Sequence, residues 1–368
     1  MGPRRTLWCW GSNEWGQLGD RTLERRLRPV AIAGPEGVVG VSLGLRSSCA
    51  LDSQRRVWCW GVLAWPQVPP TAPEPRVLGT RARIASISLG LGHACLREDS
   101  GEVWCWGYNG SGELGLGRCL PGHFADFPGD QVPASESLQV PNLPPMEQIS
   151  PSTLYNAGFA SDDTLWTWGG GRCADPPPPA VARRPPEAIG ARRRAHLPGV
   201  SGVSAGGGTL CARTLQGAVH CMGENLFGTL GDGATASRPE FGPVEGLEEV
   251  TALEGTLNSF CAVRRDGSLW CWGDNEFGQL GVGLEGHDAC HAPSMRHVLN
   301  NLPVPCRRRP TRVLLPGPVR QVAVGVFHVC AVLFDESLWC WGRNEHGEVG
   351  DGSLQERWLP VEVSWSRS

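Results

Sequence analysis

The sequence predicts an all-β protein, a seven-bladed β-propeller, on three observations. The chain of 368 residues contains 50 glycines, 31 prolines and 16 tryptophans but four methionines, a composition typical of short strands joined by turns. A strand of the type W-C-W-G recurs about every 50 residues, and a glycine-rich tail follows most copies. Units of this size cannot bury both faces of a small sheet alone, so we expect them to stack around an axis.

The repeat is located by the residue that precedes the glycine of the W-C-W-G strand. The gaps between successive copies range from 46 to 69 residues. The longer gaps coincide with proline-rich or arginine-rich inserts near 116–147, 171–199 and 284–318, which we interpret as loops within a single domain, residues 1–368. The seven marker positions are Trp10, Trp60, Trp106, Trp168, Met222, Trp272 and Trp341.

Each complete repeat is predicted to contain a hairpin and a tail. An alternating strand such as ISLGLGHACL (87–96) precedes the W-C-W-G strand, and steps such as Asp-Gly between them are typical of hairpin turns. The tail has the form G-x-N-x-x-G-x-L-G, in which glycines supply positive φ angles. Two copies, 61–70 and 169–179, lack this tail. Both faces of the W-C-W-G strand are apolar, so we interpret its tryptophans as core residues, with a light-sensing or ligand-stacking role as the alternative.

Ten of the fifteen cysteines form five couples whose members lie ten residues apart. In one couple, Arg265–Gly267 is predicted to form a three-residue turn that places Cys261 opposite Cys271. Counted outward from the turn, these two cysteines form a non-hydrogen-bonded pair of the antiparallel ladder. The Cα atoms of such a pair are about 4.5 Å apart, which a disulfide can span. The fourth repeat has Ala157 and Thr167 at the equivalent positions, so both cysteines are absent together. We predict disulfides, with reduced core cysteines as the alternative. The couples are Cys49 with Cys59, Cys95 with Cys105, Cys211 with Cys221, Cys261 with Cys271, and Cys330 with Cys340.

Five cysteines lie outside this pattern. Cys290 and Cys306 occur in one insert, and we expect them to staple it. Cys119 and Cys173 lie in neighbouring exit loops and either pair with each other or stay free, whereas Cys9 has no partner in the sequence. The strand that should precede Cys9 is missing, and residues 357–365 supply at most one edge strand toward closure. We therefore expect an incomplete first blade, or the loss of an N-terminal piece that also carried a secretion signal. Persistent disulfides predict an extracellular or cell-envelope location.

The repeated tail and the strand GLGHACL resemble the regulator of chromosome condensation repeat, and the resemblance extends over nearly the whole chain. The cysteine-bearing variant looks like the bacterial, often exported branch of that family. The resemblance implies a seven-bladed β-propeller. Relatives activate a small nuclear GTPase, sense ultraviolet light through tryptophans, or inhibit β-lactamases, and all act through the faces of the propeller. None of their functional residues can be matched to positions in this chain.

Other candidate sites are weaker. The insert HDACHAPSMRH has a spacing that could ligate zinc, but a stapled, solvated loop is favoured. We interpret His93 and His328 as core histidines, and the basic runs 191–195 and 306–310 as solvated loops. The Asp-Gly steps at Asp232 and Asp351 are interpreted as turns rather than calcium loops. The possible zinc ligands are His287, Asp288, Cys290, His291 and His297.

The predicted function is that of a non-catalytic, protein-binding propeller that recognises a partner through its loop face. A formal charge of -4 gives no overall attraction to nucleic acid, and no apolar run is long enough to span a bilayer. We expect a monomer with no cofactor and no metal, and a partner protein of unknown identity. The alternatives are a guanine-nucleotide exchange regulator of a small GTPase, and an enzyme that gathers its groups around a central channel.

Overall fold

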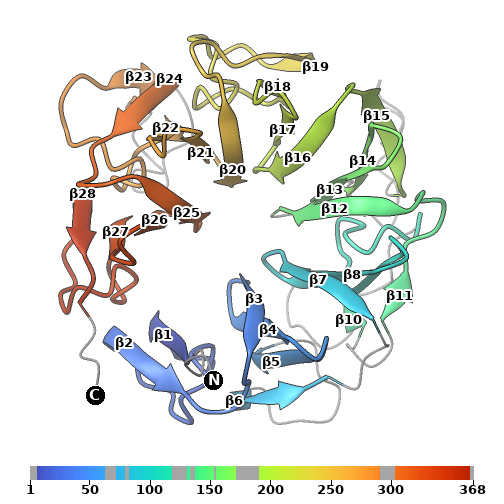
Figure 1. Ribbon diagram of the computed structural model, residues 1–368, viewed down its shortest axis with the longest axis vertical. Helices are drawn as coiled ribbons and strands as arrows, with labels where there is room; N and C mark the ends of the chain where they lie inside the picture. The colour runs from blue at the N-terminus through green and yellow to red at the C-terminus, as the bar shows by residue number, and fades with distance from the viewer. Residues whose placement is uncertain are drawn as a thin grey trace, which may run out of the picture. The chain divides into compact units, whose positions relative to one another are not determined.

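The structure is a computed structural model that describes residues 6–62, 72–78, 83–117, 131–132, 137–152, 155–170, 190–290 and 303–364 (Figure 1). These residues form antiparallel strands and turns, with no helix. None of the described residues therefore belongs to a helix that could cross a membrane. The strands assemble into seven separate sheets, and the chain divides into two compact units.

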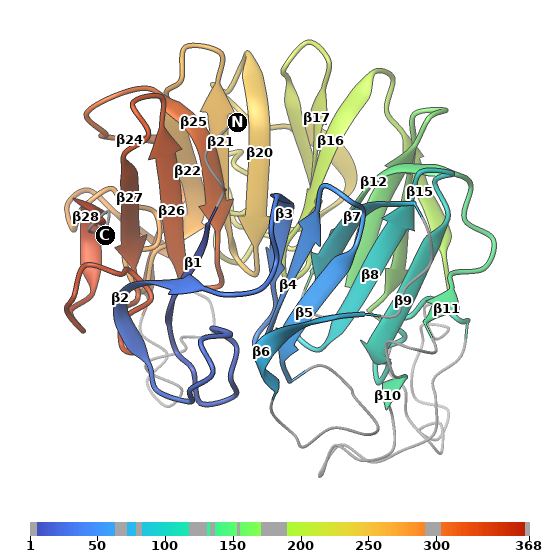
Figure 2. The ribbon, with the colours of Figure 1, turned by 60° about the horizontal axis from the view of Figure 1, so that its bottom comes forward.

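The first unit comprises Met1–Cys9, Asn13–Glu24 and Val30–Leu197 and contains three sheets of four or five strands. Within it, β7 packs against β3 of the preceding sheet, and β12 packs against β7. Figure 2 shows β3, β4, β5 and β6 running side by side in this order. The strands are β3 (Val38–Leu43), β4 (Ser47–Asp52), β5 (Val57–Gly61), β6 (Ala72–Val77), β7 (Ile84–Leu89), β8 (His93–Glu98), β9 (Val103–Tyr108), β10 (Gln131–Val132), β11 (Leu138–Gln139), β12 (Met146–Pro151), β13 (Tyr155–Ala160), β14 (Thr164–Gly169) and β15 (Arg192–His196).

The second unit comprises Trp10–Ser12, Arg25–Pro29 and Pro198–Ser368 and also contains three such sheets. Here β20 packs against β16, and β25 packs against β20. The strands are β16 (Val200–Ala205), β17 (Thr209–Thr214), β18 (Val219–Gly223), β19 (Arg238–Pro243), β20 (Val250–Thr256), β21 (Ser259–Arg264), β22 (Leu269–Asp274), β23 (Asp288–Cys290), β24 (Val304–Val313), β25 (Val319–Val324), β26 (His328–Leu333), β27 (Leu338–Gly342) and β28 (Arg357–Glu362).

The first repeat forms the seventh sheet, which has two strands, β1 (Leu7–Gly11) and β2 (Arg26–Ile32). The all-β propeller class is thus confirmed, but the count of seven blades is corrected to six blades of four or five strands plus this smaller sheet. The physical reason is that the first repeat supplies only the two outer strands of a blade. The C-terminal strand β28 is the outer strand of the last blade, where it pairs with β27.

The three inserts contain strands as well as loops. The insert near 116–147 includes β10 and β11, that near 171–199 includes β15, and that near 284–318 includes β23 and β24. The basic run 191–195 lies almost wholly in β15, and the run 306–310 lies within β24, so their interpretation as loops was wrong. Arginine is accommodated there because the side chains of Arg192, Arg193 and Arg194 in β15 are exposed, and those of residues 307–309 in β24 are exposed or half-buried.

The hairpin register has the predicted form. Cys261 lies opposite Cys271, and the fourth repeat places Ala157 opposite Thr167 at the equivalent step. Gly267 has a φ of 78°, as the predicted turn requires. The register therefore follows from the turn, and it brings every cysteine of the five couples opposite its partner.

A buried asparagine holds each described tail in shape. Its Oδ1 accepts a hydrogen bond from the backbone N–H five residues later, at 2.8 to 2.9 Å in all five tails. In the first tail the Nδ2 group of Asn13 also donates to the carbonyls of Thr22 and Glu24. One side chain thus ties both ends of the loop together. The five asparagines are Asn13, Asn109, Asn225, Asn275 and Asn344. The two segments that lack the tail motif, 61–70 and 169–179, lie mainly outside the described residues.

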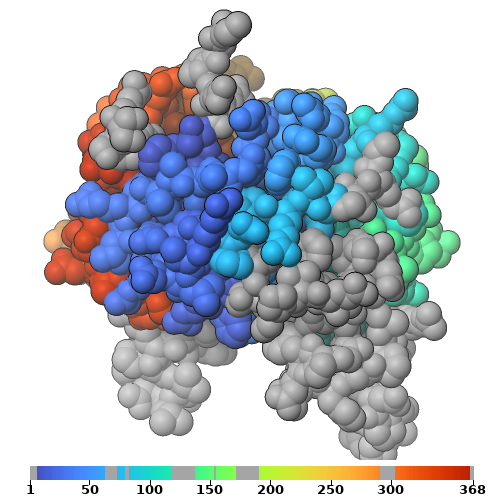
Figure 3. Space-filling view, turned by 90° about the horizontal axis from the view of Figure 1, so that it is seen from below, coloured from blue at the N-terminus to red at the C-terminus, as the bar shows by residue number. Residues whose placement is uncertain are grey.

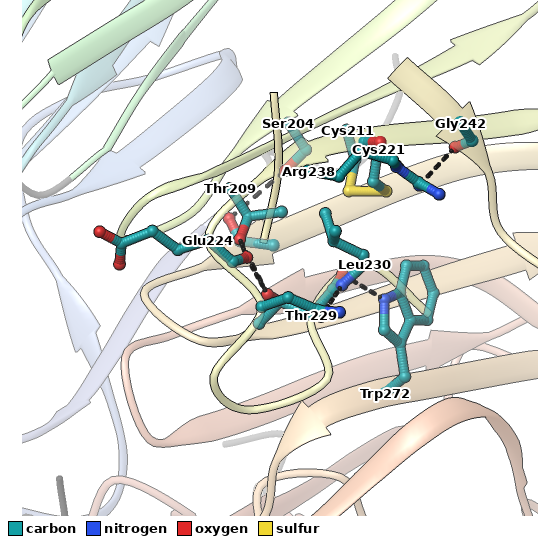
Figure 4. The surroundings of a disulfide bond; sticks show 12 residues. Ser204, Thr209, Cys211, Cys221, Glu224, Thr229, Leu230, Arg238, Gly242 and Trp272 are labelled. Atoms are coloured by element: carbon teal, nitrogen blue, oxygen red, sulfur yellow. Dashed lines mark hydrogen bonds between the residues drawn. A yellow bond between two sulfur atoms is a disulfide. The ribbon is translucent and has the colours of Figure 1, made fainter. Parts of the chain in front are cut away.

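Each fixed tail contacts the tryptophan of the repeat that follows it. In Figure 4, the indole Nε1–H of Trp272 donates to the carbonyl of Thr229 at 2.8 Å. Trp60 donates to Gln17, Trp341 to Gln279 and Trp10 to Glu348 in the same way, at 2.8 to 3.0 Å. The glycine two residues after each acceptor has positive φ and lies against the indole ring. The carbonyl and the glycine of the tail motif therefore form a contact between one sheet and its neighbour.

His93 is a buried core residue, as the sequence predicted, and lies in a second kind of contact between sheets. Its Nε2–H donates to Oδ1 of Asn156 at 2.8 Å, and the Nδ2 group of Asn156 donates to the carbonyl of Glu113. Burial lowers the pKa of His93 to about 4, although the hydrogen bond to Asn156 opposes the shift. His328 is half-buried, and burial lowers its pKa as well.

Replacement of Gly281 by alanine tests the tail contact. Gly281 and Gly283 both have a positive φ, 69° and 75°. A Cβ atom at Gly281 would lie 2.6 Å from Nε1 of Trp341, which is too close. A Cβ atom at Gly283 would have Leu359 as its nearest neighbour, at 3.6 Å, an ordinary contact distance. We expect Gly283→Ala to lower the free energy of unfolding by about 1 kcal/mol, and Gly281→Ala by about 2 to 4 kcal/mol, because only the latter adds overlap to backbone strain. Urea denaturation of both variants measures this, and equal losses would contradict the contact.

Acid unfolding tests the buried state of His93. His93 takes up a proton near pH 6.5 in the unfolded chain but only near pH 4 in the folded chain. The contribution of neutral, buried His93 to the free energy of unfolding is therefore complete above pH 6.5 and falls as the pH drops toward 4. Between pH 7.5 and 4.5 we expect wild type to lose about 2.5 kcal/mol more than His93→Gln, which keeps a donor for Asn156. Urea titrations at both pH values measure the difference. Parallel losses in the two proteins would refute the assignment.

Candidate functional site

Six cysteine pairs lie at disulfide distance, and they include every residue proposed from the sequence. Five join the second and third strands of a sheet, with S–S distances of 2.06 to 2.12 Å and a Cα separation of 4.1 Å. The sixth is Cys290–Cys306, with an S–S distance of 1.97 Å. Cys9 is free and half-buried, while Cys119 and Cys173 lie outside the described residues.

The sixth pair fixes an arm on the outer edge of one blade of the second unit. We call β23 and β24 together the stapled arm; both are visible in Figure 1 at the edge of their sheet. β24 pairs with β22 on one side and with β23 on the other. Cys290 and Cys306 are fully buried with Val304 and with Phe227, which belongs to the tail of the preceding sheet, so the arm packs against its neighbour. It is therefore a rigid addition to the blade.

The possible zinc ligands of this insert are otherwise engaged. Nδ1–H of His287 donates to the carbonyl of Leu284 at 2.9 Å, and its Nε2 accepts from the side chain of Asn275. Cys290 is bonded to Cys306, and Asp288 accepts from Arg308. His291 and His297 lie outside the described residues. Among the residues that the structure describes, no group of three or more His, Cys, Asp or Glu side chains could hold a metal ion.

Arg307 differs from the arginines that occupy the same place in other blades. Arg238 and Arg357, which pair in register with the glycine that ends the third strand, form ion pairs with Asp232 and Asp351 of their own tails. Arg307 pairs with the equivalent Gly273, but its tail has valine, Val282, where the aspartate would be.

Consequently Arg307 makes no ion pair within the described part of the chain. Its Nη2 group donates to the carbonyl of Glu285, and its buried Nε has no hydrogen-bond partner. The next two arginines are neutralised, Arg308 by Asp288 at 3.1 Å and Arg309 by Glu245. The arm therefore carries one excess positive charge that the fold does not use.

A cavity of about 170 Å³ lies beside these arginines. It is formed between two consecutive sheets of the second unit, because Gly233 of one tail donates its N–H to the carbonyl of Arg308 at 2.9 Å. Gly233 has a φ of 82°, and a Cβ there would lie 2.6 Å from the Arg309 guanidinium. The lining residues are Gly233, Asp288, Arg307, Arg308, Arg309 and Thr311.

The cavity is electrostatically positive. Burial would raise the pKa of Asp288, but hydrogen bonds from the backbone and side chain of Arg308 lower it below its ordinary value. Asp288 is thus ionised at neutral pH, and since Asp288 pairs with Arg308 and Glu245 pairs with Arg309, the three arginines leave a net formal charge of about +1. Two leucines lie exposed beside the arm: Leu284, adjoining Gly283, and Leu359, whose side chain faces that glycine. Arginine with exposed apolar groups is typical of protein interfaces.

This surface could not be recognised in the sequence. The arginine run and the cysteine staple are each visible there, but periodicity does not show that the insert returns to the sheet as β24. The signal that could have found Arg307 is the comparison of tails, because Asp232 and Asp351 occupy the seventh position after the tail asparagine and Val282 does not match them.

Three solved structures share this fold. Yeast RCC1 (Prp20), in a crystal structure with bound Kap60, is 17% identical with a TM-score of 0.76 over 100% of this chain and 85% of that one. Prp20p from Saccharomyces cerevisiae, described with its binding properties to Gsp1p and histones, is 17% identical with a TM-score of 0.75 over 100% and 87%. Human WBSCR16 is 16% identical with a TM-score of 0.77 over 98% and 95%. At these identities the likeness shows the fold alone.

No curated protein matches the chain in sequence. The family comparison does match, over residues 6–368, and the family is described as the RCC1-like domain. This range contains all seven repeats, six of them marked by tryptophan and one by Met222, together with the tails and the stapled arm. The resemblance noted in the sequence is therefore confirmed, and the chain belongs to the RCC1-like domain family.

Proposed function

We propose that this protein is a non-catalytic binding scaffold of the bacterial, cysteine-rich branch, exported and stapled by disulfides, that recognises an acidic partner protein through the stapled arm. The observation that carries the proposal is Arg307, a positive charge at a preformed cavity without a carboxylate of its own chain within ion-pair distance among the described residues. A partner carboxylate would supply the ion pair that Arg238 and Arg357 obtain within their tails.

The size and surroundings of the cavity favour a protein partner. A volume of about 170 Å³ accommodates one acidic side-chain head group, not a large cofactor. The exposed Leu284 and Leu359 beside the arm provide apolar area around that charged contact. Because the Cys290–Cys306 pair and the Gly233 contact hold the arm in place, little ordering is required on binding.

Export is proposed because twelve cysteines lie in six pairs at disulfide distance, which an oxidising compartment would maintain. The exchange regulators of the family act inside cells, where thiols stay reduced.

Thiol titration under denaturing conditions distinguishes these compartments. For the protein purified without reductant from its native source, we expect at most three reactive thiols among the fifteen cysteines, since six pairs are bonded. Alkylation before and after reduction, read by mass spectrometry, counts them. Nearly fifteen thiols would contradict export and favour an intracellular regulator.

Charge reversal in the arm tests the binding function. We expect Arg307→Glu to weaken partner binding at least about tenfold, because it removes the ion pair and adds repulsion. The matched control is Arg265→Glu, at an exposed arginine that pairs with Glu249 of its own blade. Proteins of the exported fraction are captured on wild type and both variants and quantified, and candidates are then measured with purified components. A partner bound equally by all three proteins would contradict the role of the arm.

A further inference from the structure

One outer strand of the described sheets lacks the proline that the others contain. An outer strand is here the strand that pairs with the far side of a W-C-W-G-type strand, and Figure 3 shows one of them, the cyan β6, at the surface beside the blue first repeat. Proline has no N–H group to offer to a further strand, so it keeps an exposed sheet edge from pairing. Among the described outer strands of five or more residues, β15 alone contains none. The prolines of the others are Pro29 in β2, Pro73 and Pro75 in β6, Pro239 and Pro243 in β19, Pro305 and Pro310 in β24, and Pro360 in β28.

β15 carries three successive arginines instead. Arg192, Arg193 and Arg194 are all exposed, and none of them forms an ion pair with a carboxylate of the described residues. The pKa of Asp162, in the turn of the same sheet, is lowered chiefly by hydrogen bonds from Thr164, and the charge of Arg193 contributes less. Arginine at a strand edge repels a second copy of the same strand but attracts a strand that carries carboxylates. The edge of β15 is thus protected against one kind of strand only.

The three arginines are distributed over both faces of the sheet. Arg192 is in register with Thr167, and Arg194 donates its Nε–H to Oγ1 of Thr167 at 2.6 Å, so both lie on the face of Thr167. Arg193 is in register with Trp166, the next residue of β14, and therefore lies on the opposite face. A strand added to this edge would meet an arginine whichever way its side chains point.

The backbone of β15 at Arg193 is available for pairing. Within the described part of the chain β15 pairs with β14 alone, and Figure 1 shows it at the outer margin of its sheet. Arg193 lies opposite Trp166, and the equivalent pair in the next sheet is Pro243 opposite His220. Because a proline without an N–H group occupies this place in β19, pairing with the neighbouring strand does not require an N–H there. The N–H of Arg193 can therefore bind a strand on the other side.

From these observations we propose that β15 binds an extended acidic segment of a partner polypeptide, which adds a strand to the edge of β15 and places carboxylates against Arg192, Arg193 and Arg194. Backbone hydrogen bonds supply part of the affinity in strand addition, and the side chains that alternate along the edge supply the specificity. The arginines of both faces therefore select a segment with several acidic residues in succession.

The unpaired backbone favours a polypeptide over other polyanions. A nucleic acid or a sulfated glycan could neutralise the arginines, but neither has the alternating N–H and C=O groups that pair with a strand edge. The absence of proline from β15 matters to a polypeptide partner only. The site lies in the first unit, whereas the stapled arm lies in the second, so this proposal does not depend on the proposed function.

Three fluorescent peptides with blocked ends test the proposal on the full chain. The probe has three successive glutamates flanked on both sides by alternating threonine and valine. A second peptide has lysines for the glutamates, and a third keeps the glutamates but has proline for the flanking valines, which removes N–H groups needed for pairing. At low ionic strength we expect the probe to bind at least about tenfold more tightly than either, as measured by fluorescence anisotropy. Equal binding of the probe and the proline peptide, or equally tight binding of a single-stranded oligothymidine of the same charge, would overturn strand addition.

Two variants of one residue separate backbone pairing from charge. Arg193→Gln removes the charge alone, and we expect it to weaken probe binding about threefold. Arg193→Pro also removes the N–H group, and we expect at least about tenfold weaker binding at unchanged thermal stability, since Pro243 occupies this place in β19. The matched control is Arg76→Gln in β6, which lies opposite Cys59 as Arg192 lies opposite Thr167, and it should bind the probe as wild type does.

Hydrogen exchange locates the added strand. When the probe saturates the wild-type chain, we expect backbone exchange at residues 192–195 to slow at least about tenfold, while exchange at residues 74–77 of β6 stays the same. An equal loss of affinity in Arg193→Gln and Arg193→Pro, a loss in neither, or protection at another strand and not at β15 would overturn the proposal.

Discussion

The packing of a tryptophan on the glycine-rich tail of a neighbouring sheet is the contact that recurs between sheets. At four places the indole also donates a hydrogen bond to a tail carbonyl, and at Trp168 the ring lies against Gly115 without that bond. A tryptophan ring can approach that carbonyl only where the tail presents a glycine with positive φ, since a Cβ would overlap the ring at Gly281 or Gly350. The tail in turn keeps its shape through its buried asparagine, as at Asn344. The residues of the repeated motif thus serve one purpose, to join one sheet to the next.

The cysteine pairs act within sheets. Each of the five regular pairs joins adjacent strands of one hairpin, so it closes a short loop and stabilises by somewhat under about 3 kcal/mol in the chain-entropy view. The fourth repeat, with Ala157 opposite Thr167, keeps its sheet without such a pair. Covalent bonds therefore strengthen individual blades, whereas the adhesion between blades depends on the tails and on buried pairs such as His93 with Asn156.

The sequence allowed the fold class, the hairpin register and the cysteine pairs to be predicted because each depends on local spacing. Turn residues such as Gly267 fix the register, and the register fixes which residues face each other. The strand β24 could not be predicted in this way, since its return to β22 across the insert depends on tertiary pairing. The 56% exposure of Val41 in β3 could not be predicted either, because the alternating apolar sequence of β3 has the same form as that of first strands whose equivalent residue is buried.

Departures from the repeat are therefore the most informative positions in this chain. In a repeat protein each position of the repeat occurs several times in one chain. A residue can therefore be compared with its equivalents in the other repeats, and a residue without the partner that those equivalents have is recognised from a single sequence. Arg307 lacks the aspartate that pairs with Arg238 in the equivalent place, because its tail has Val282 there. At the fourth repeat, by contrast, both cysteines of the couple are replaced together, by Ala157 and Thr167. Retention of Arg307 without its aspartate is the reason for placing the proposed partner contact at this residue rather than at a position where the repeat is intact.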